Sequence, residues 1–201
     1  MSNMIGKLTE MVFIVDRSGS MSGLESDTIG GFNSMIEKQK KEGDGIVSTV
    51  LFSNDIEILH DRVNLKDVGK MTSEEYYVTG STALLDAVGG TIDRIKRTQT
   101  SQLENVPDVT LFIIITDGME NSSREYSYKK VKGMIEKQKE EGWDFLFLGA
   151  NIDVAEEADR LGIGRTNAIE YECHSEGISE MYECIDRKMS FARNHGHFDQ
   201  F

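Results

Sequence analysis

Cysteine and proline are both scarce in this chain of 201 residues, which contains two cysteines, Cys173 and Cys184, and one proline. A chain of this length can bury a core without covalent staples. Two cysteines also do not make the dense disulfide framework of a small secreted domain. We therefore expect two reduced thiols, both far from the candidate site described below.

Long apolar runs and clusters of basic residues are absent as well. No apolar run approaches the roughly 20 residues of a membrane-spanning helix, and Met1 to Glu10 lacks the apolar segment of a signal peptide. The chain has 22 basic and 35 acidic residues, a net charge of −13. This charge disfavours nucleic acid and anionic membranes as partners. We expect a soluble, cytoplasmic protein.

Apolar runs that are typical of buried strands recur along the chain. Continuous runs rich in β-branched residues favour strands covered on both faces, as in a parallel sheet. The turn Asn54-Asp55 makes the strand after it an antiparallel edge. Strands are expected over Met11 to Val15, Ile46 to Phe52, Ile56 to His60, Val109 to Ile115, Trp143 to Leu148 and Ala168 to Tyr171.

Amphipathic segments between these runs predict helices. Two capping-box patterns, Ser22 with Glu25 and Ser122 with Glu125, predict helix starts. Glycines that follow the apolar stripes predict helix ends. Helices are expected from Ser22 to Gly43, after Thr82, from Ser122 to Gly142, from Val154 to Leu161 and from Ile178 to Met189, with irregular backbone and a short helix within Leu65 to Tyr77.

This alternation predicts an α/β fold, a doubly wound, mostly parallel six-stranded sheet with one antiparallel edge strand and helices on both faces. One domain is expected over residues 1–201, with its core at 9–193 and a loose tail at 194–201. Ligands of such sheets bind beyond the carboxyl ends of the strands, where strand order reverses. If the strands at Met11 and Val109 are neighbours there, Asp16 and Asp117 meet.

Oxygen-bearing side chains cluster in three loops of the sequence. Asp16, Ser18 and Ser20 follow the first apolar run, and Asp117 follows the run that ends at Ile115. Thr82 lies in a third loop, just before a helix. These loops contain no cysteine or histidine, so their donors suit a hard cation such as Mg²⁺ or Mn²⁺ rather than zinc.

These three segments, in this order, resemble the metal-ion-dependent adhesion site of von Willebrand factor A domains. The shared residues are Asp16-x-Ser18-x-Ser20, Thr82 within Gly80-Ser81-Thr82, and Thr116-Asp117-Gly118. A single Asp-x-Ser-x-Ser would be a weak signal, whereas the three parts together are specific. The likeness covers nearly the whole chain and points to the bacterial-type, intracellular, stand-alone form of the domain.

The resemblance implies a role for each matching residue. Ser18 and Ser20 would ligate the cation directly, and Thr82 would bind it directly or through water. Asp16 and Asp117 would act mainly through bound waters. One coordination position would remain for a glutamate or aspartate of a partner protein.

Several single residues also allow roles other than metal binding or lie outside the metal-binding motif. Asp16 could be the nucleophile of a Mg²⁺-dependent phosphatase or phosphotransferase, although Ser18 stands where such enzymes have a second acid. His60 is expected to be solvated. His195 and His197 could hold a metal, but a disordered end is favoured. Tyr76 and Tyr77 either rim the site or pack beneath it, and Met21 and Glu120 are candidate contact residues.

The leading hypothesis is a non-enzymatic, Mg²⁺-dependent protein-binding module that recruits an acidic side chain of its partner. The resemblance implies an adaptor in an ATPase or stress-response system, such as tellurite resistance. The phosphatase is the alternative, and a structural role with an empty site is a third.

Overall fold

The computed structural model describes residues 8–101 and 106–198 and contains a six-stranded sheet in the order β3-β2-β1-β4-β5-β6. Only the pairing of β2 with β3 is antiparallel; the other neighbours run parallel. The strands are β1 (Thr9–Asp16), β2 (Gly45–Phe52), β3 (Ile56–Asn64), β4 (Val109–Thr116), β5 (Trp143–Gly149) and β6 (Ala168–Glu170). The predicted doubly wound sheet with one antiparallel edge is thus confirmed.

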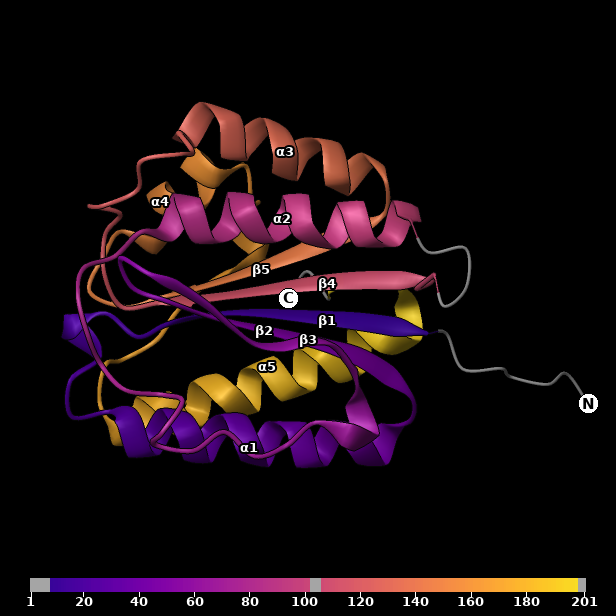
Figure 1. Ribbon diagram of the computed structural model, residues 1–201, viewed down its shortest axis with the longest axis horizontal. Helices are drawn as coiled ribbons and strands as arrows, with labels where there is room; N and C mark the ends of the chain where they lie inside the picture. Colours follow the sequence, from indigo (N-terminus) through magenta and orange to yellow (C-terminus); the bar gives the residue numbers. More distant parts are fainter. Residues whose placement is uncertain (1–7, 102–105, 199–201) are drawn as a thin grey trace, which may run out of the picture.

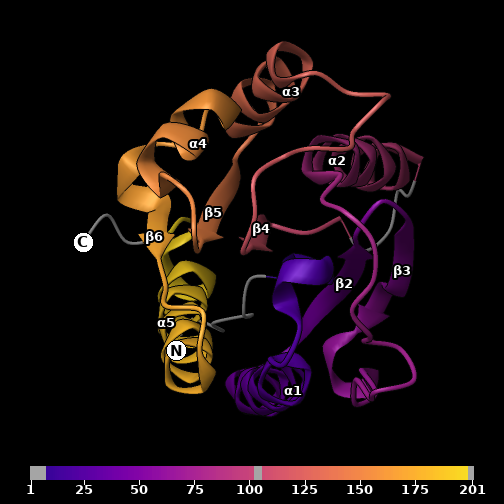
Figure 2. The same cartoon turned by 90° about the vertical axis from the view of Figure 1, so that its left-hand side faces the viewer.

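Helices cover both faces of the sheet (Figure 1, Figure 2). α1 and α5 lie on one face, and α2, α3 and α4 lie on the other. The helices are α1 (Glu25–Glu42), α2 (Leu84–Ser101), α3 (Tyr128–Glu140), α4 (Val154–Leu161) and α5 (Ser175–His195), with short 3₁₀ turns η1 (Gly19–Met21), η2 (Leu65–Asp67) and η3 (Arg165–Asn167). No helix of the described residues has the length and apolarity to cross a membrane.

The central strand β1 is apolar without interruption because it packs against helices on both faces. Met11, Phe13 and Val15 point to the side of α1 and α5, and Val12 and Ile14 point to the side of α2. All five side chains are completely buried. β4 alternates in the same way beside it, since parallel strands covered on both faces need no polar face.

The two capping-box predictions were wrong about where helices begin. α1 starts at Glu25 with Leu24 in the capping position, while Ser22 closes the 3₁₀ turn before it. The Ser122–Glu125 segment is not helical, and α3 starts later, capped by Ser127. The physical reason is tertiary: Asp86 accepts hydrogen bonds from the amides of residues 124, 125 and 126 and so holds this segment against α2.

The expectation of a loose tail from Asn194 was also wrong for the residues that the structure describes. α5 continues to His195, and Phe198 is buried. The Phe198 amide donates a 2.8 Å hydrogen bond to Asp144 Oδ2 at the start of β5. The buried ring and this hydrogen bond hold Phe198 against the rest of the fold. Residues 199–201 lie outside the described part.

Candidate metal centre

The ends of β1 and β4 are joined through the carboxylate of Asp16. Register places these two strands side by side, which is the condition for Asp16 and Asp117 to meet. Asp16 is completely buried, and each of its oxygens accepts one hydrogen bond. Oδ1 accepts from the Ser18 amide at 2.7 Å, and Oδ2 accepts from the Thr116 hydroxyl at 2.6 Å. The first carboxylate of the predicted site therefore lies where strand order reverses.

The other expected residues converge on the same edge, onto which Figure 2 looks. Ser18 Oγ lies 3.1 Å from Ser20 Oγ, and Ser20 Oγ donates to Asp117 Oδ1 at 2.5 Å. A Cβ atom at Gly118 would lie 3.3 Å from Thr82 Oγ1 and 3.4 Å from Ser20 Oγ. Gly118 thus lets the Thr82 and Asp117 loops approach each other, and the oxygens of all three loops face one region.

Backbone hydrogen bonds hold the Thr82 loop in place. The Gly19 amide donates to Gly80 O at 3.1 Å, which ties this loop to the Ser18–Ser20 turn. Thr82 and Asn121 form a reciprocal pair: the Thr82 amide donates to Asn121 Oδ1 at 2.9 Å, and the Asn121 amide donates to Thr82 O at 3.0 Å. Sequence reasoning missed Asn121 because no short motif reports a contact across 39 residues.

The two expected contact residues beside the loops have other roles. Met21 is completely buried in the core. Glu120 accepts from the amide of Leu85, in the first turn of α2, and from the amides of Ser122 and Ser123. Neither side chain is free to meet a partner, so these two predictions were wrong. Met119, two residues after Asp117, is 61% exposed, and sequence reasoning missed it.

The sequence left open whether Tyr76 and Tyr77 rim the site or pack beneath it, and the structure gives the two residues different positions. Tyr76 packs beneath the site, where its hydroxyl donates to Asp16 O at 2.7 Å. Tyr77 is 47% exposed and carries the Arg17 guanidinium over its ring.

His60, which was expected to lie in solvent, is instead buried, with Nδ1 3.0 Å from Thr49 Oγ1. His195 lies on α5 rather than in a disordered end.

The electrostatics of the site favour a bound cation. Burial raises the pKa of Asp16 and of Asp117, and the charge of Asp117 raises the pKa of Asp16 further. No basic side chain of the described residues forms an ion pair with either acid; the neighbouring Arg17 binds Glu57 instead, at 2.8 Å. Two buried carboxylates facing hydroxyls, with no basic partner, fit a divalent cation that supplies the missing positive charge.

The types of donor atom at the site limit which metal ions it suits. The described residues contain no group of three or more histidine, cysteine, aspartate and glutamate side chains placed to share a metal. A cation here would use hydroxyl oxygens, waters and at most two carboxylates. Mg²⁺ keeps several of its waters in proteins and suits such a site.

One finding overturns part of the sequence argument against zinc. Cys173, expected to lie far from the cluster, places Sγ 3.7 Å from Asp117 Oδ2. Burial and the nearby Asp117 carboxylate raise the pKa of this thiol, so it is a neutral donor to Asp117. The chain reaches this position because Tyr171 donates its hydroxyl to Thr116 O at 3.2 Å, just before Cys173. A sulfur atom, which is a soft ligand once it is deprotonated, therefore lies at the edge of the site.

Cys173→Ala is expected to lower the affinity of the site for Zn²⁺ but not its affinity for Mg²⁺. Removing the thiol should weaken Zn²⁺ binding by roughly tenfold or more, because zinc prefers sulfur, and should leave Mg²⁺ binding nearly unchanged. Calorimetric titration of both metals into wild type and variant measures this difference. Cys184→Ala is the control, since Cys184 is a free cysteine with no hydrogen bond to the site. Equal Zn²⁺ affinities in all three proteins would show that the thiol does not ligate.

Comparison with known proteins identifies the fold. No protein-family model and no curated protein sequence matches the chain. Many solved structures do. The von Willebrand factor domain of the type V pili tip protein Mfa5 from Porphyromonas gingivalis has a TM-score of 0.68 at 10% identity, covering 98% of this chain and 100% of its own. The PilB minor pilin from Streptococcus sanguinis has a TM-score of 0.68 at 15% identity, covering 94% of this chain and 63% of its own.

The description of a third structure names a metal site. Proximal thread matrix protein 1 from the mussel byssus, described with a zinc-occupied MIDAS motif, has a TM-score of 0.64 at 15% identity. The match covers 92% of this chain and 46% of that one. The chain thus spans less than two thirds of the pilin and less than half of the byssus protein. It has the fold of von Willebrand factor A domains, as its sequence pattern predicts.

Proposed function

We propose that Asp16, Ser18, Ser20, Thr82 and Asp117 hold a divalent cation, Mg²⁺ or Mn²⁺, and that the chain uses it to bind a partner protein. The observation that carries this proposal is the convergence of three loops on two buried carboxylates, neither of which has a basic partner within residues 8–101 and 106–198. Ser18, Ser20 and Thr82 would bind the ion through their hydroxyls. Asp16 and Asp117 would orient its waters.

The partner group that this site suits is a glutamate or aspartate side chain. Hydroxyl and water ligands neutralise little of the cation's charge, so the ion stays strongly attractive to a carboxylate. The chain's own charge of −13 opposes acidic partners at long range, but screening over about 8 Å at physiological salt limits this repulsion. Exposed Met119 and Tyr77 add apolar surface of the kind that protein interfaces use.

The geometry gives less support to an enzyme that uses Asp16 as a nucleophile. Asp16 has no accessible surface, and both of its oxygens already accept hydrogen bonds. A nucleophilic carboxylate needs an oxygen open to the substrate. We therefore place the chain among non-enzymatic binding modules. We also place it in the cytoplasm, where its two free cysteines would stay reduced.

Capture of the partner is expected to require the metal. Tagged protein incubated with host extract in Mg²⁺ should retain a protein that chelator elutes, and Ser18→Ala, which lacks one hydroxyl ligand, should not retain it. The eluted protein, once purified, should bind wild type again in Mg²⁺ and lose affinity when its contacting acid is changed to the amide. Retention that is indifferent to chelator and to Ser18→Ala would refute the proposal.

A further inference from the structure

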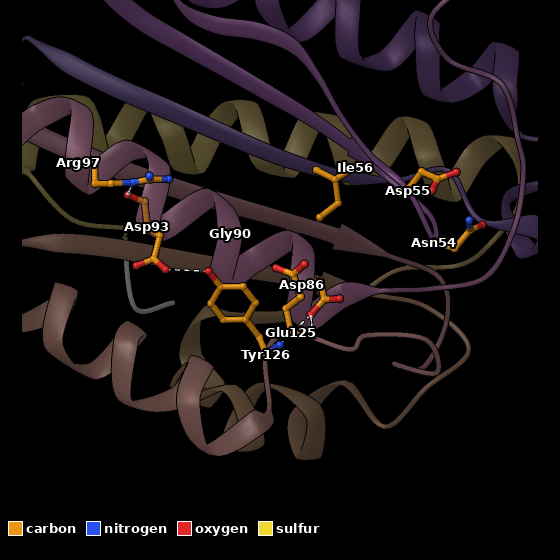
Figure 3. A pocket seen from close by; sticks show the side chains of 9 residues that line it. All are labelled: Asn54, Asp55, Ile56, Asp86, Gly90, Asp93, Arg97, Glu125 and Tyr126. Atoms are coloured by element: carbon orange, nitrogen blue, oxygen red, sulfur yellow. Dashed lines mark hydrogen bonds between the residues drawn. The ribbon is translucent and has the colours of Figure 1, made fainter.

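A hollow of about 770 Å³ lies beside α2, and none of the proposed metal ligands lines it (Figure 3). One wall is the turn between β2 and β3, with Asp55 and Ile56. The other is the segment before α3, with Glu125 and Tyr126. Between them, α2 presents Gly90, where an added Cβ would meet no atom within 4 Å. The glycine therefore leaves a notch in the helix surface, open to solvent.

The charge of this hollow is strongly negative. Four carboxylates and one guanidinium line it, so four negative charges against one positive leave a formal charge of −3. Asp86 and Asp93 are fixed by hydrogen bonds to the backbone of residues 124–126 and to the Tyr126 hydroxyl. Asp55 and Glu125 differ: both are exposed, and neither carboxylate accepts a hydrogen bond or forms an ion pair with a described residue. Two carboxylates are thus available to an incoming group.

Apolar surface adjoins this acidic hollow. Ile56 lines it and is 45% exposed, and Ile58, two residues along the same face of β3, is 40% exposed. β3 is the last strand on its side of the sheet. Contiguous exposed apolar side chains mark interaction sites more often than isolated ones do. The surface thus combines an acidic recess with an apolar border. This combination suits a basic side chain that is flanked by apolar residues.

We infer that this surface, defined by Asp55, Ile56, Ile58, Gly90 and Glu125, docks a basic segment of a partner protein. An arginine or lysine side chain enters the notch at Gly90 and faces Asp55 and Glu125. Apolar residues that flank it cover the two isoleucines. Charge complementarity selects this occupant, and the chain's net charge of −13 speeds its approach. The surface contains none of the proposed metal ligands, so its binding does not depend on Mg²⁺.

The test uses short synthetic peptides in which valines flank a single arginine, with citrulline as the neutral replacement. Calorimetric titration is carried out in chelator, so failure here is distinct from failure of the metal centre. The arginine peptide should bind wild type saturably and the citrulline peptide at least about tenfold more weakly. Gly90→Trp, which fills the notch, should abolish binding. Gly133→Trp makes the same change at an exposed, open position of α3 and should not.

A second pair of variants separates local charge from net charge. Asp55→Asn with Glu125→Gln should weaken the arginine peptide by at least about tenfold. Glu136→Gln with Glu140→Gln removes the same two charges from the exposed face of α3 and should leave its affinity unchanged. The inference would be overturned if the arginine peptide did not bind saturably, or if the citrulline peptide bound with equal affinity. It would also be overturned if the affinity for the arginine peptide fell equally in a variant of the surface and in its matched control.

Discussion

Asp16→Asn is expected to lower the Mg²⁺ affinity of the chain by about 10- to 100-fold while leaving the fold intact. Groups that orient the waters and ligands of a metal typically have effects of this size. The amide keeps the shape of the carboxylate but loses its charge. The Thr116 hydroxyl can turn toward Gly118 O, 3.1 Å away, and accept from the new amide, so local packing survives. Calorimetric titration of Mg²⁺ into both proteins measures the loss.

The same variant has an opposite effect on the metal-free protein. Burial raises the pKa of Asp16 in the folded state, so stability is lost as the pH rises from the ordinary pKa of an aspartate to that raised value, and the loss is complete above it. In chelator at neutral pH, Asp16→Asn should therefore melt at or above the temperature of wild type. The advantage should shrink as the pH falls through the folded-state pKa. A variant that melts well below wild type at neutral pH in chelator would mean that Asp16 has a structural role instead.

Gly80→Ala is expected to destabilise the fold by roughly 2 kcal/mol. Gly80 has φ +71°, a left-handed conformation that costs an alanine roughly 1–2 kcal/mol. Its new Cβ would also lie 1.7 Å from Asn54 Oδ1, so that side chain must move. Because Gly80 O accepts from the Gly19 amide, Mg²⁺ affinity should fall as well. Denaturant unfolding in chelator measures the stability, and titration measures the affinity.

Two controls divide the effect of Gly80→Ala into its causes. Gly90→Ala adds the same methyl group where nothing lies within 4 Å, so it should stabilise α2 by up to about 1 kcal/mol. Asn54→Ala combined with Gly80→Ala removes the steric clash and should recover part of the loss, leaving the backbone strain. If Gly80→Ala and Gly90→Ala prove equally stable, the strained loop is not what positions the site.

The sheet could be predicted from sequence because its signal is local. Runs such as Leu111 to Ile115 have no polar face, which is the pattern of a strand covered on both sides. The approach of Asp16 to Asp117 depended on one premise, that the strands at Met11 and Val109 are neighbours. The structure places β1 beside β4 as that premise requires.

The features that sequence reasoning missed depend on contacts between distant segments. Ser122 and Glu125 satisfy a capping pattern, but Asp86 holds that segment in another conformation. Cys173 lies far from Asp117 along the chain, and the thiol reaches the site through contacts between distant segments, among them the pairing of β5 with β6 and the Tyr171 hydrogen bond to Thr116. Thr116 was part of the sequence motif, but its hydrogen bond to Asp16 was not predicted. No sequence motif pointed to Met119 or Asn121.

The most direct test of the metal centre is to locate the ion. Crystals grown with Mn²⁺ and measured at the manganese absorption edge would show where it binds. We predict one strong anomalous peak among the hydroxyls of Ser18, Ser20 and Thr82, beside Asp117, and its loss in Asp16→Asn crystals. A manganese peak elsewhere on the molecule with none at this edge of the sheet, at saturating Mn²⁺, would contradict the proposed function.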